Sequence, residues 1–332
     1  MEKLPEPYYQ TRLGSAYLRD AKQILGTGEL DGKVDLIETS PPFALRRKKQ
    51  YGNVDADEYV SWFLEFASLF HRVLKPSGSL VLEIGGSWNR GEPTRSLYHY
   101  ELLIRTCSLP DSKFYLAQEF FVYNPARLPT PAEWVTVRRE RVKDAVNCVW
   151  WLSKTAHPKA DNRQVLRPYS RSMEELFERG YKPMLRPSGH DISSKFGRRN
   201  GGAIPPNLLQ IANTESNSRY LRACRQSGIR PHPARYPIAL PEFFIKFLTE
   251  PGDLVLDPFA GSNVTGEACE ALGRHWIAIE TVEEYLVGSR FRFDEFCVGA
   301  WEDASGKSCF VLREGESAYA GKETPQSGSP TQ

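Results

Sequence analysis

Two short apolar runs near the start of the chain enclose an amphipathic segment. Residues 34–39 and 79–84 have the length and composition of buried strands, and between them apolar residues recur at helical spacing from Glu58 to Leu74. The Lys-Pro-Ser-Gly sequence at 75–78 is expected to end this helix. A strand, a helix and a second strand in this order predict a β-α-β unit in which the two strands are parallel and adjacent.

The same alternation returns in the last third of the chain. Residues 253–257 form a short apolar strand that leads into Asp-Pro-Phe-Ala-Gly-Ser, and a helix is expected over 264–272. Residues 274–280 give a further strand, which closes with Glu280. This alternation predicts an α/β fold with a doubly wound sheet, in which ligands bind at the carboxyl ends of the strands.

The middle of the chain is less regular. Residues 154–206 are rich in Arg, Pro, Gly and Ser and have no sustained periodicity, which predicts an inserted lobe or a set of long loops. Just before them, the apolar run 146–152 contains Trp150 and Trp151, which we expect in the core rather than on a stacking surface. The last residues, 313–332, are polar and predict a disordered tail.

Composition narrows the class of protein and exposes a charge asymmetry. With 40% hydrophobic and 25% charged residues, no apolar run near the roughly 18 residues of a membrane span and no secretory signal, a soluble cytoplasmic protein is expected. Six widely spaced cysteines without a C-x-x-C pair predict reduced thiols and no metal site. The net charge of +2 conceals a stretch, residues 155–235, with fifteen Lys and Arg against six Asp and Glu. Such a stretch is the expected footprint of DNA binding, and a solvated arginine-rich surface explains the charge alone equally well.

The strand ends of the last third carry groups suited to a nucleotide-like ligand. The loop that follows residues 253–257 is built of small residues, so its backbone N–H groups would approach a ligand closely. Asp257 is suited to hold a cationic ammonium, and Glu280 is placed to accept hydrogen bonds from two ribose hydroxyls. For Gly261 alone an ordinary strand-to-helix turn is the better explanation, but acids at two strand ends favour a ligand site.

A second motif, Ser40-Pro41-Pro42-Phe43, follows the first predicted strand. Two prolines fix φ and remove two backbone donors, which leaves a stiff loop with outward carbonyl acceptors. The Ser40 hydroxyl and the Pro41 carbonyl would accept both hydrogens of an –NH₂ group, and Phe43 would stack on an extruded base. Alone, the four residues are more typical of a rigid turn. Their place at a strand end, in a sheet that also carries the Asp257 loop, favours a catalytic site.

The order of these two motifs resembles that of the β-class DNA amino-methyltransferases, in which the cofactor motif follows the catalytic one. The resemblance extends from Gly14 to Arg292 and is strongest to the PvuII-type cytosine-N4-specific enzymes, through residues 39–45, the Arg-Lys run after them and 51–53. It implies a Rossmann-like methyltransferase fold with a mostly parallel seven-stranded sheet and a circularly permuted motif order. It also implies S-adenosyl-L-methionine as the cofactor.

The resemblance assigns further site residues. It gives Asp20 a hydrogen bond from the adenine amine of the cofactor, although Arg19 replaces the family's glycine before it, and it places His232 beside the cofactor pocket. Family members with Asp or Asn in place of Ser40 usually methylate adenine N6, so Ser40 favours cytosine N4. The predicted catalytic residues are Ser40, Pro41, Pro42, Phe43 and Glu83, and the predicted cofactor-binding residues are Asp20, His232, Asp257, Phe259, Gly261, Ser262 and Glu280.

Glu83 ends the strand next to the one that carries Ser40. The resemblance suggests that its carboxyl faces the base pocket and supports either the serine or the cytosine ring, whereas a solvated strand-end glutamate is the plain alternative. A bond from Glu83 to cytosine N3 would require a protonated carboxyl and hence a pKa raised by burial. Direct methyl transfer to the amine then needs neither a cysteine nucleophile nor a strong general base.

The DNA contacts are expected in the basic stretch and beside the catalytic loop. Together with the two motifs, this placement divides the chain into four expected regions: a catalytic half, 1–153; a target-recognition region, 154–206; a cofactor-binding half, 207–312; and a disordered tail, 313–332. Double-stranded DNA is the expected partner, with a separate cognate restriction endonuclease and no obligate protein partner. The predicted DNA-binding residues are Arg46, Arg47, Lys48, Lys49, Arg163, Arg167, Arg171, Lys195, Arg198 and Arg199.

Three alternatives stay open at this point. The first is a DNA adenine-N6 methyltransferase with an atypical serine, which differs only in the modified nucleoside. A dehydrogenase of the Rossmann type would need G-x-G-x-x-G after a strand, whereas the Asp257 loop has one early glycine. An inactive DNA-binding module would be expected to lack the acids of a cofactor site, yet Asp20, Asp257 and Glu280 are all present.

Overall fold

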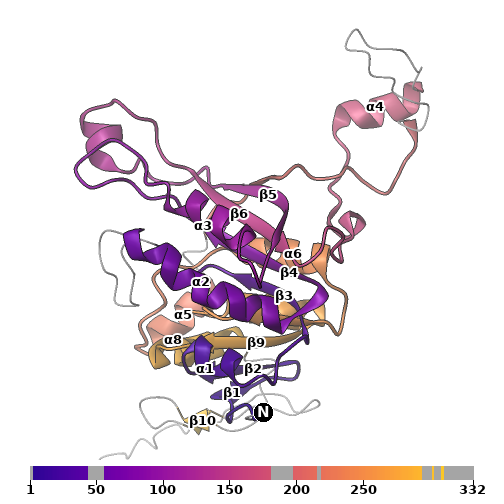
Figure 1. Cartoon of the computed structure of the whole chain (residues 1–332). Coiled ribbons are helices and arrows are strands. Elements are labelled where there is room, and N and C mark those ends of the chain that lie inside the picture. The colour runs from indigo at the N-terminus through magenta and orange to yellow at the C-terminus, as the bar shows by residue number, and fades with distance from the viewer. Residues whose placement is uncertain are drawn as a thin grey trace, which may run out of the picture.

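A nine-stranded sheet forms the centre of the molecule (Figure 1). The computed structural model describes residues 3–43, 56–180, 197–214, 218–293, 301–302 and 308–309. The spatial order of the strands is β1-β2-β9-β8-β3-β4-β6-β5-β7. In chain order they are β1 (Tyr9–Gln10), β2 (Gly14–Leu18), β3 (Val34–Thr39), β4 (Leu74–Ile84), β5 (Tyr115–Tyr123), β6 (Val146–Ser153), β7 (Leu208–Gln210), β8 (Leu254–Asp257) and β9 (His275–Glu280).

The sheet is parallel from β2 to β4 in its spatial order and mixed beyond β4. Strands β2, β9, β8, β3 and β4 are parallel neighbours, whereas β6 is antiparallel to β4 and to β5, and β7 runs parallel to β5. The predicted sheet of seven mostly parallel strands is therefore present, and the two-residue β1 and three-residue β7 extend it at its edges. Strands this short leave no periodicity in the sequence, which is why they were not predicted.

Helices cover both faces of the sheet, as a doubly wound fold requires. They are α1 (Ala21–Gly26), α2 (Ala56–Val73), α3 (Tyr98–Cys107), α4 (Arg171–Arg179), α5 (Arg219–Gln226), α6 (Ala239–Leu248), α7 (Val264–Leu272) and α8 (Glu283–Ser289), and a small pair of strands, β10 (Trp301–Glu302) and β11 (Ser308–Cys309), follows. One core holds residues of α1, α2 and α3, and the other holds residues of α6, α7 and α8. None of the described helices has the length and apolar character that a bilayer crossing requires.

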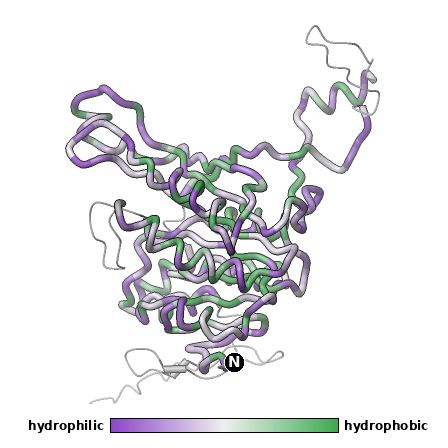
Figure 2. The backbone as a smooth tube through the Cα atoms, viewed as in Figure 1, coloured by the Kyte–Doolittle hydropathy of each residue, from purple (hydrophilic) through white to green (hydrophobic). Residues whose placement is uncertain are grey.

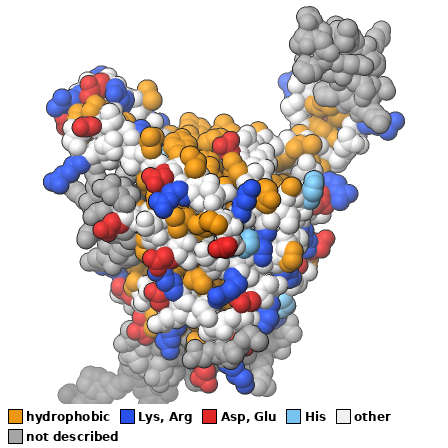
Figure 3. Space-filling model, in the orientation of Figure 1, with side chains coloured by type: hydrophobic (Ala, Val, Ile, Leu, Met, Phe, Trp, Pro, Cys, Tyr) orange, Lys and Arg blue, Asp and Glu red, His pale blue; other side chains and the backbone are white. Residues whose placement is uncertain are grey.

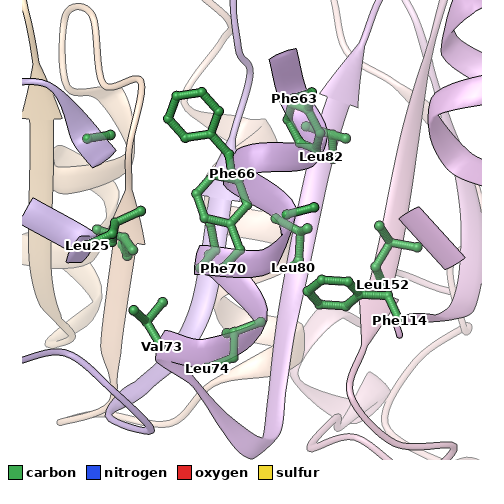
Figure 4. Close-up of a cluster of buried hydrophobic side chains, with 14 of the residues drawn as sticks. Leu25, Phe63, Phe66, Phe70, Val73, Leu74, Leu80, Leu82, Phe114 and Leu152 are labelled. Carbon is green, nitrogen blue, oxygen red and sulfur yellow. The ribbon is translucent and has the colours of Figure 1, made fainter. Parts of the chain in front are cut away.

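The apolar stripe of α2 explains much of the first core. Phe63, Phe66 and Phe70 are buried against Leu80 and Leu82 of β4 (Figure 4). A fully buried phenylalanine or leucine contributes about 1.5–3 kcal/mol relative to an exposed one, so this face anchors the helix to the sheet. The hydrophobic positions concentrate in the body of the molecule (Figure 2). Trp150 and Trp151 are 1% and 7% exposed, which confirms their predicted place in the core.

Two projections rise from the same end of the body (Figure 1). The hairpin arm, residues 124–145, joins β5 to β6 and contains the short π-helix η1 (Glu133–Val137). The helical arm, residues 154–206, joins β6 to β7 and contains the 3₁₀ helix η2 (Asn162–Val165) and α4, with residues 181–196 outside the described part. The inserted lobe was predicted without a helix. Helix α4 is only nine residues long and is capped by the Ser170 side chain, so its signal is too short to detect by periodicity.

Candidate active site

A cavity of about 640 Å³ opens where several strands end, and it brings most of the predicted site residues together. The wall includes loops that follow β2, β3, β8 and β9, together with β4 and the loop before α6. Of the twelve predicted catalytic and cofactor-binding residues, eleven line this cavity: Asp20, Ser40, Pro41, Pro42, Phe43, Glu83, His232, Phe259, Gly261, Ser262 and Glu280. The twelfth, Asp257, lies behind the wall.

The Ser-Pro-Pro-Phe loop leaves the end of β3 and is held against the end of β4. The Phe43 ring packs on Gly85, where a Cβ atom would lie 2.7 Å from the ring. The Tyr98 hydroxyl, from α3, donates a hydrogen bond to the Gly85 carbonyl and fixes this backbone from the other side. Glycine at position 85 therefore allows the aromatic ring of the loop to lie directly on the strand end.

Glu83 faces the same loop and is 8% exposed. Its Oε1 accepts a hydrogen bond from Asn147 Nδ2 at 2.9 Å, and its carboxylate also accepts one from the Ser40 hydroxyl. Burial raises the pKa of Glu83, whereas the bonds from Asn147 and Ser40 and the nearby charge of Arg127 act in the opposite direction. A buried carboxylate thus contacts the predicted catalytic serine.

On the opposite wall, Glu280 organises the loop that follows β8. Its Oε2 accepts a hydrogen bond from the Gly261 N–H at 2.8 Å, and its Oε1 accepts two more from the N–H groups of Thr281 and Val282, at 2.8 and 2.9 Å. Burial raises the pKa of Glu280 and these backbone bonds oppose the rise. Gly261 has φ +51°, and a Cβ there would lie 3.0 Å from the His232 ring, so glycine is required for this close approach.

Asp257 is buried, at 2% exposure, and it connects the two motifs. Its Oδ1 accepts hydrogen bonds from the hydroxyl of Thr39 at 2.8 Å and the N–H of Phe259 at 3.2 Å, and its Oδ2 accepts one from the Thr265 hydroxyl at 2.7 Å. Burial raises its pKa to about 6 despite these bonds. Because Thr39 directly precedes Ser40, Asp257 ties the loop after β8 to the start of the Ser-Pro-Pro-Phe loop.

Asp20 lies at the edge of the cavity as the N-cap of α1. Its Oδ1 accepts a hydrogen bond from the Lys22 N–H at 2.7 Å, which fixes the position of its carboxylate. His232 lies edge-on to the ring of Tyr285, with the ring centroids 4.5 Å apart, and its backbone N–H donates to the Tyr220 hydroxyl. Each predicted cofactor residue on this side is thus held by neighbours of its own.

With this geometry established, similarity to known proteins decides the family. Residues 34–289 match the family model N6_N4_Mtase, described as DNA methylase. The chain belongs to this DNA methylase family. The chain is 52% identical to the type II methyltransferase M.PvuII of Proteus hauseri, over 87% of this chain and 86% of that protein. It is 27% identical to the type II methyltransferase M.BglII of Bacillus subtilis, over 85% of this chain and 69% of the relative.

Solved structures agree with this assignment. The PvuII DNA methyltransferase (cytosine-N4-specific) superposes with a TM-score of 0.70 at 45% identity, covering 87% of this chain and 89% of that one. A protein of Thermus thermophilus, proposed to be a DNA modification methylase and complexed with S-adenosyl-L-methionine, superposes with a TM-score of 0.51 at 20% identity. The match covers 90% of this chain and 99% of that one. The second likeness establishes the shared fold only.

The cavity of the methylase also contains residues that the sequence did not single out. Trp62 and Phe66 of α2 pack against Phe259, with ring centroids 5.8 and 5.1 Å apart. Their helical spacing matches a core face, so periodicity gave no sign that they line a site. Asn147 and Arg127 are further unexpected members, and both lie at the root of the hairpin arm. The antiparallel pairing of β4 with β6 is what brings Asn147 to Glu83.

The predicted DNA-contacting residues of the methylase fall into two groups. Arg46, Arg47, Lys48, Lys49 and Lys195 lie outside the described residues. The others occupy exposed positions on the helical arm, where three of them form surface ion pairs, Arg163 with Asp161, Arg171 with Glu175 and Arg199 with Glu174. Exposed pairs of this kind contribute little to stability, so these arginines can exchange a carboxylate for a phosphate at small cost.

The hairpin arm is a second basic surface, and it was not predicted. Residues 124–145 contain five Lys and Arg against three Asp and Glu. Lys and Arg side chains gather at its outer end in Figure 3, across a gap from the helical arm. Leu128 and Val142 on this arm are 74% and 87% exposed. The excess positive charge here is smaller than in residues 155–235, so the charge pattern of the sequence does not reveal this surface.

Proposed function

We propose that this chain is a site-specific DNA methyltransferase that modifies N4 of a flipped-out cytosine, with S-adenosyl-L-methionine as methyl donor. The observation that carries the proposal is the placement of the Ser40 hydroxyl at the cavity, in hydrogen-bond contact with the buried Glu83. The 45% identity to a solved cytosine-N4-specific enzyme supports the choice of cytosine over adenine.

One wall of the cavity, called the cofactor wall here, is formed by Asp20, His232, Phe259, Gly261, Ser262 and Glu280. Its residues fit the proposed methyl donor. Glu280 ends β9 with a carboxylate fixed by backbone N–H groups, which suits it to the ribose hydroxyls, and Asp20 presents a fixed carboxylate suited to the adenine amine. His232, Phe259, Gly261 and Ser262 form the loops between these two acids. Asp257 acts from behind the wall and positions these loops. When bound, S-adenosyl-L-methionine supplies an electrophilic sulfonium methyl group.

The other wall, the catalytic wall, is formed by Ser40, Pro41, Pro42, Phe43 and Glu83, and it prepares the amine for methyl transfer. Ser40 and the Pro41 carbonyl accept the two hydrogens of the cytosine amine and draw its lone pair out of conjugation with the ring. Phe43, seated on Gly85, offers a face for the extruded base, and Pro42 stiffens the loop between them. Transfer leaves a cationic amine, which is acidic enough to give its extra proton to solvent, so these residues need only align the base with the methyl donor.

The two arms suit a DNA duplex. They project from one end of the body (Figure 1), and both carry excess positive charge. Arg163, Arg167, Arg171, Arg198 and Arg199 supply phosphate or guanine contacts on the helical arm. Since the substrate is DNA, we place the enzyme in the cytoplasm, beside a separate restriction endonuclease of the same specificity.

The modified nucleoside tests the proposal directly. Purified protein is incubated with duplex DNA and S-adenosyl-L-methionine, the DNA is digested to nucleosides, and N4-methylcytosine is expected. N6-methyladenine as the product would overturn the cytosine assignment, and no methylated nucleoside would overturn the function. Base-level sequencing of the same DNA identifies the target sequence.

The Ser40→Ala variant assigns the role of the hydroxyl. We expect a fall in kcat on the order of 100-fold with unchanged cofactor affinity, because one of two acceptors for the amine is lost. Ser96→Ala, a hydroxyl change at a residue outside the cavity lining, serves as the matched control. Near-normal turnover of Ser40→Ala would exclude the proposed role.

A further inference from the structure

Asn147 links the catalytic carboxylate with the hairpin arm. It lies near the start of β6, where its Nδ2 donates to Glu83 Oε1 at 2.9 Å and its Oδ1 accepts from Arg127 Nη1 at 2.8 Å. A guanidinium only donates hydrogen bonds, so it requires the oxygen of the amide and not its nitrogen. Arg127 therefore fixes the amide orientation, and Asn147 must present N–H groups to Glu83.

The hydrogen bonds around Glu83 all run in one direction. Asn147 donates to it, and the Ser40 hydroxyl donates to it as well. A serine hydroxyl has one hydrogen and two lone pairs. When the hydrogen of Ser40 points at Glu83, its lone pairs are left to accept hydrogens from a base amine in the cavity. This arrangement requires Glu83 to be an acceptor.

We propose that Asn147, oriented by Arg127, is a positioning residue that keeps Glu83 in its accepting, carboxylate form and thereby keeps the Ser40 lone pairs turned toward the target amine. The inference rests on the function proposed above and explains how the Ser40 hydroxyl is oriented for it. It also decides between the two roles considered for Glu83, because a carboxylate that accepts from Ser40 supports the serine rather than protonating the cytosine ring.

The surroundings of Glu83 show why such positioning is needed. Among the described residues, Arg127 contributes a positive charge that lowers the pKa of Glu83, and the charge of Glu83 in turn raises the pKa of Glu38 on β3 and of Tyr236, in the loop before α6. Burial favours a neutral Glu83, which would hold a proton of its own. The donor from Asn147 and the charge of Arg127 oppose this.

Arg127 also brings the hairpin arm into the arrangement. The arm is closed at its root by the hydrogen bond from the Asn124 N–H to the Ala145 carbonyl at 2.9 Å, and Lys143 Nζ donates to the Pro125 carbonyl at 3.1 Å. Arg127 thus extends from a fixed root to the cavity. A duplex bound along this arm would contact the segment that holds Asn147 in place, and would thereby be connected to the orientation of Ser40.

The pH dependence of turnover tests the inference. Loss of the donor raises the pKa of Glu83 further, and the active form is the carboxylate, so the acidic limb of kcat against pH must move to higher pH. For Asn147→Ala and Asn147→Asp we expect a shift of roughly one pH unit, and hence a fall of about tenfold in kcat at pH values on the acidic limb. Affinity for S-adenosyl-L-methionine stays unchanged.

Two further variants separate positioning from structural support. In a Glu83→Gln background the additional Asn147→Ala change should leave the pH profile unmoved, because the titrating group is already absent. Arg127→Gln, at a partly exposed residue, should shift the limb in the same direction even where Asn147→Ala does not fold. Asn207→Ala removes an asparagine that bonds the Glu119 carbonyl outside the cavity and should leave the limb in place.

An acidic limb that stays at the wild-type pH in Asn147→Ala, Asn147→Asp and Arg127→Gln would overturn the inference, whatever their rates. So would a limb that moves to lower pH. Both results are distinguishable from failure of the proposed function, because that failure appears in the wild-type protein as the wrong methylated nucleoside or none.

Discussion

The two walls of the cavity are built in different ways. The cofactor wall comes mainly from one continuous stretch, 257–282, in which Glu280 accepts three backbone N–H groups and Gly261 approaches His232. The catalytic wall is assembled from side chains of β3, β4, β6 and the hairpin arm, which meet only in the folded sheet. The first wall depends on backbone shape, and the second depends on hydrogen-bond direction between side chains.

This difference separates the expected effects of substitution. Changes on the cofactor wall should act on binding of S-adenosyl-L-methionine, because Glu280 fixes the backbone of the loops that line this wall. Changes on the catalytic wall should act on turnover, because its side chains orient one hydroxyl and one aromatic ring. Substitutions in each wall therefore test this division.

Glu280→Gln should weaken binding of S-adenosyl-L-methionine on the order of 100-fold, because a charged acceptor is lost and the Gly261 loop loses its anchor. Isothermal titration calorimetry measures this. Glu283→Gln, at a nearby acid that accepts from the Tyr8 hydroxyl, is the matched control and should bind normally. Wild-type affinity for S-adenosyl-L-methionine in Glu280→Gln would contradict the assignment of cofactor binding to this wall.

Gly85→Ala should lower kcat about tenfold without changing cofactor affinity, because the new Cβ would lie 2.7 Å from the Phe43 ring and must displace it. Steady-state kinetics with duplex DNA measures this. Gly26→Ala, where a Cβ has no heavy atom within 4 Å, is the control. A Gly85→Ala variant that loses cofactor binding instead would mean that the two walls are not separable.

Glu38→Gln should make the protein more stable at alkaline pH. Glu38 is 3% exposed, and burial together with the charges of Asp257 and Glu83 raises its pKa well above 4.5. The unfolded chain loses this proton first as the pH rises, so the wild type loses stability from its unfolded pKa up to the folded one. We expect a gain of at least about 1 kcal/mol at pH 8 and little change at pH 4.

Denaturant unfolding at the two pH values measures this. Glu242→Gln, at a partly exposed acid that pairs with Lys246, should leave the pH dependence as in the wild type. An equal effect of Glu38→Gln at both pH values would mean that packing, not the charge of Glu38, limits stability at this position.

The cofactor wall could be predicted from the sequence because its parts are close along the chain. The run that ends at Asp257 and the strand that ends at Glu280 are 23 residues apart, and parallel pairing places their ends together. What the sequence did not reveal is the burial of Asp257. A carboxylate that accepts from two threonine hydroxyls has the same sequence pattern as one that faces a ligand.

The catalytic wall could be predicted only in part. Ser40 and Glu83 end adjacent parallel strands of one β-α-β unit, so their approach follows from topology. Asn147 follows a long connection that includes the hairpin arm, and its contact with Glu83 depends on the register of β6 against β4, where Glu83 pairs with Val149. No local pattern encodes that register, and neither arm has the periodicity that would reveal its fold.

The placement of the two arms has a consequence for how such enzymes diversify. Both arms are inserted between β5, β6 and β7, on the antiparallel side of the sheet, and the hairpin arm is closed at its root by the bond from Asn124 to Ala145. The helical arm can therefore lengthen, shorten or be replaced without moving the strands that carry Glu280 and Ser40, whereas the hairpin arm must keep the root that supplies Arg127. On the function proposed above, exchange of the helical arm would alter the DNA contacts while the residues around Ser40 are inherited unchanged.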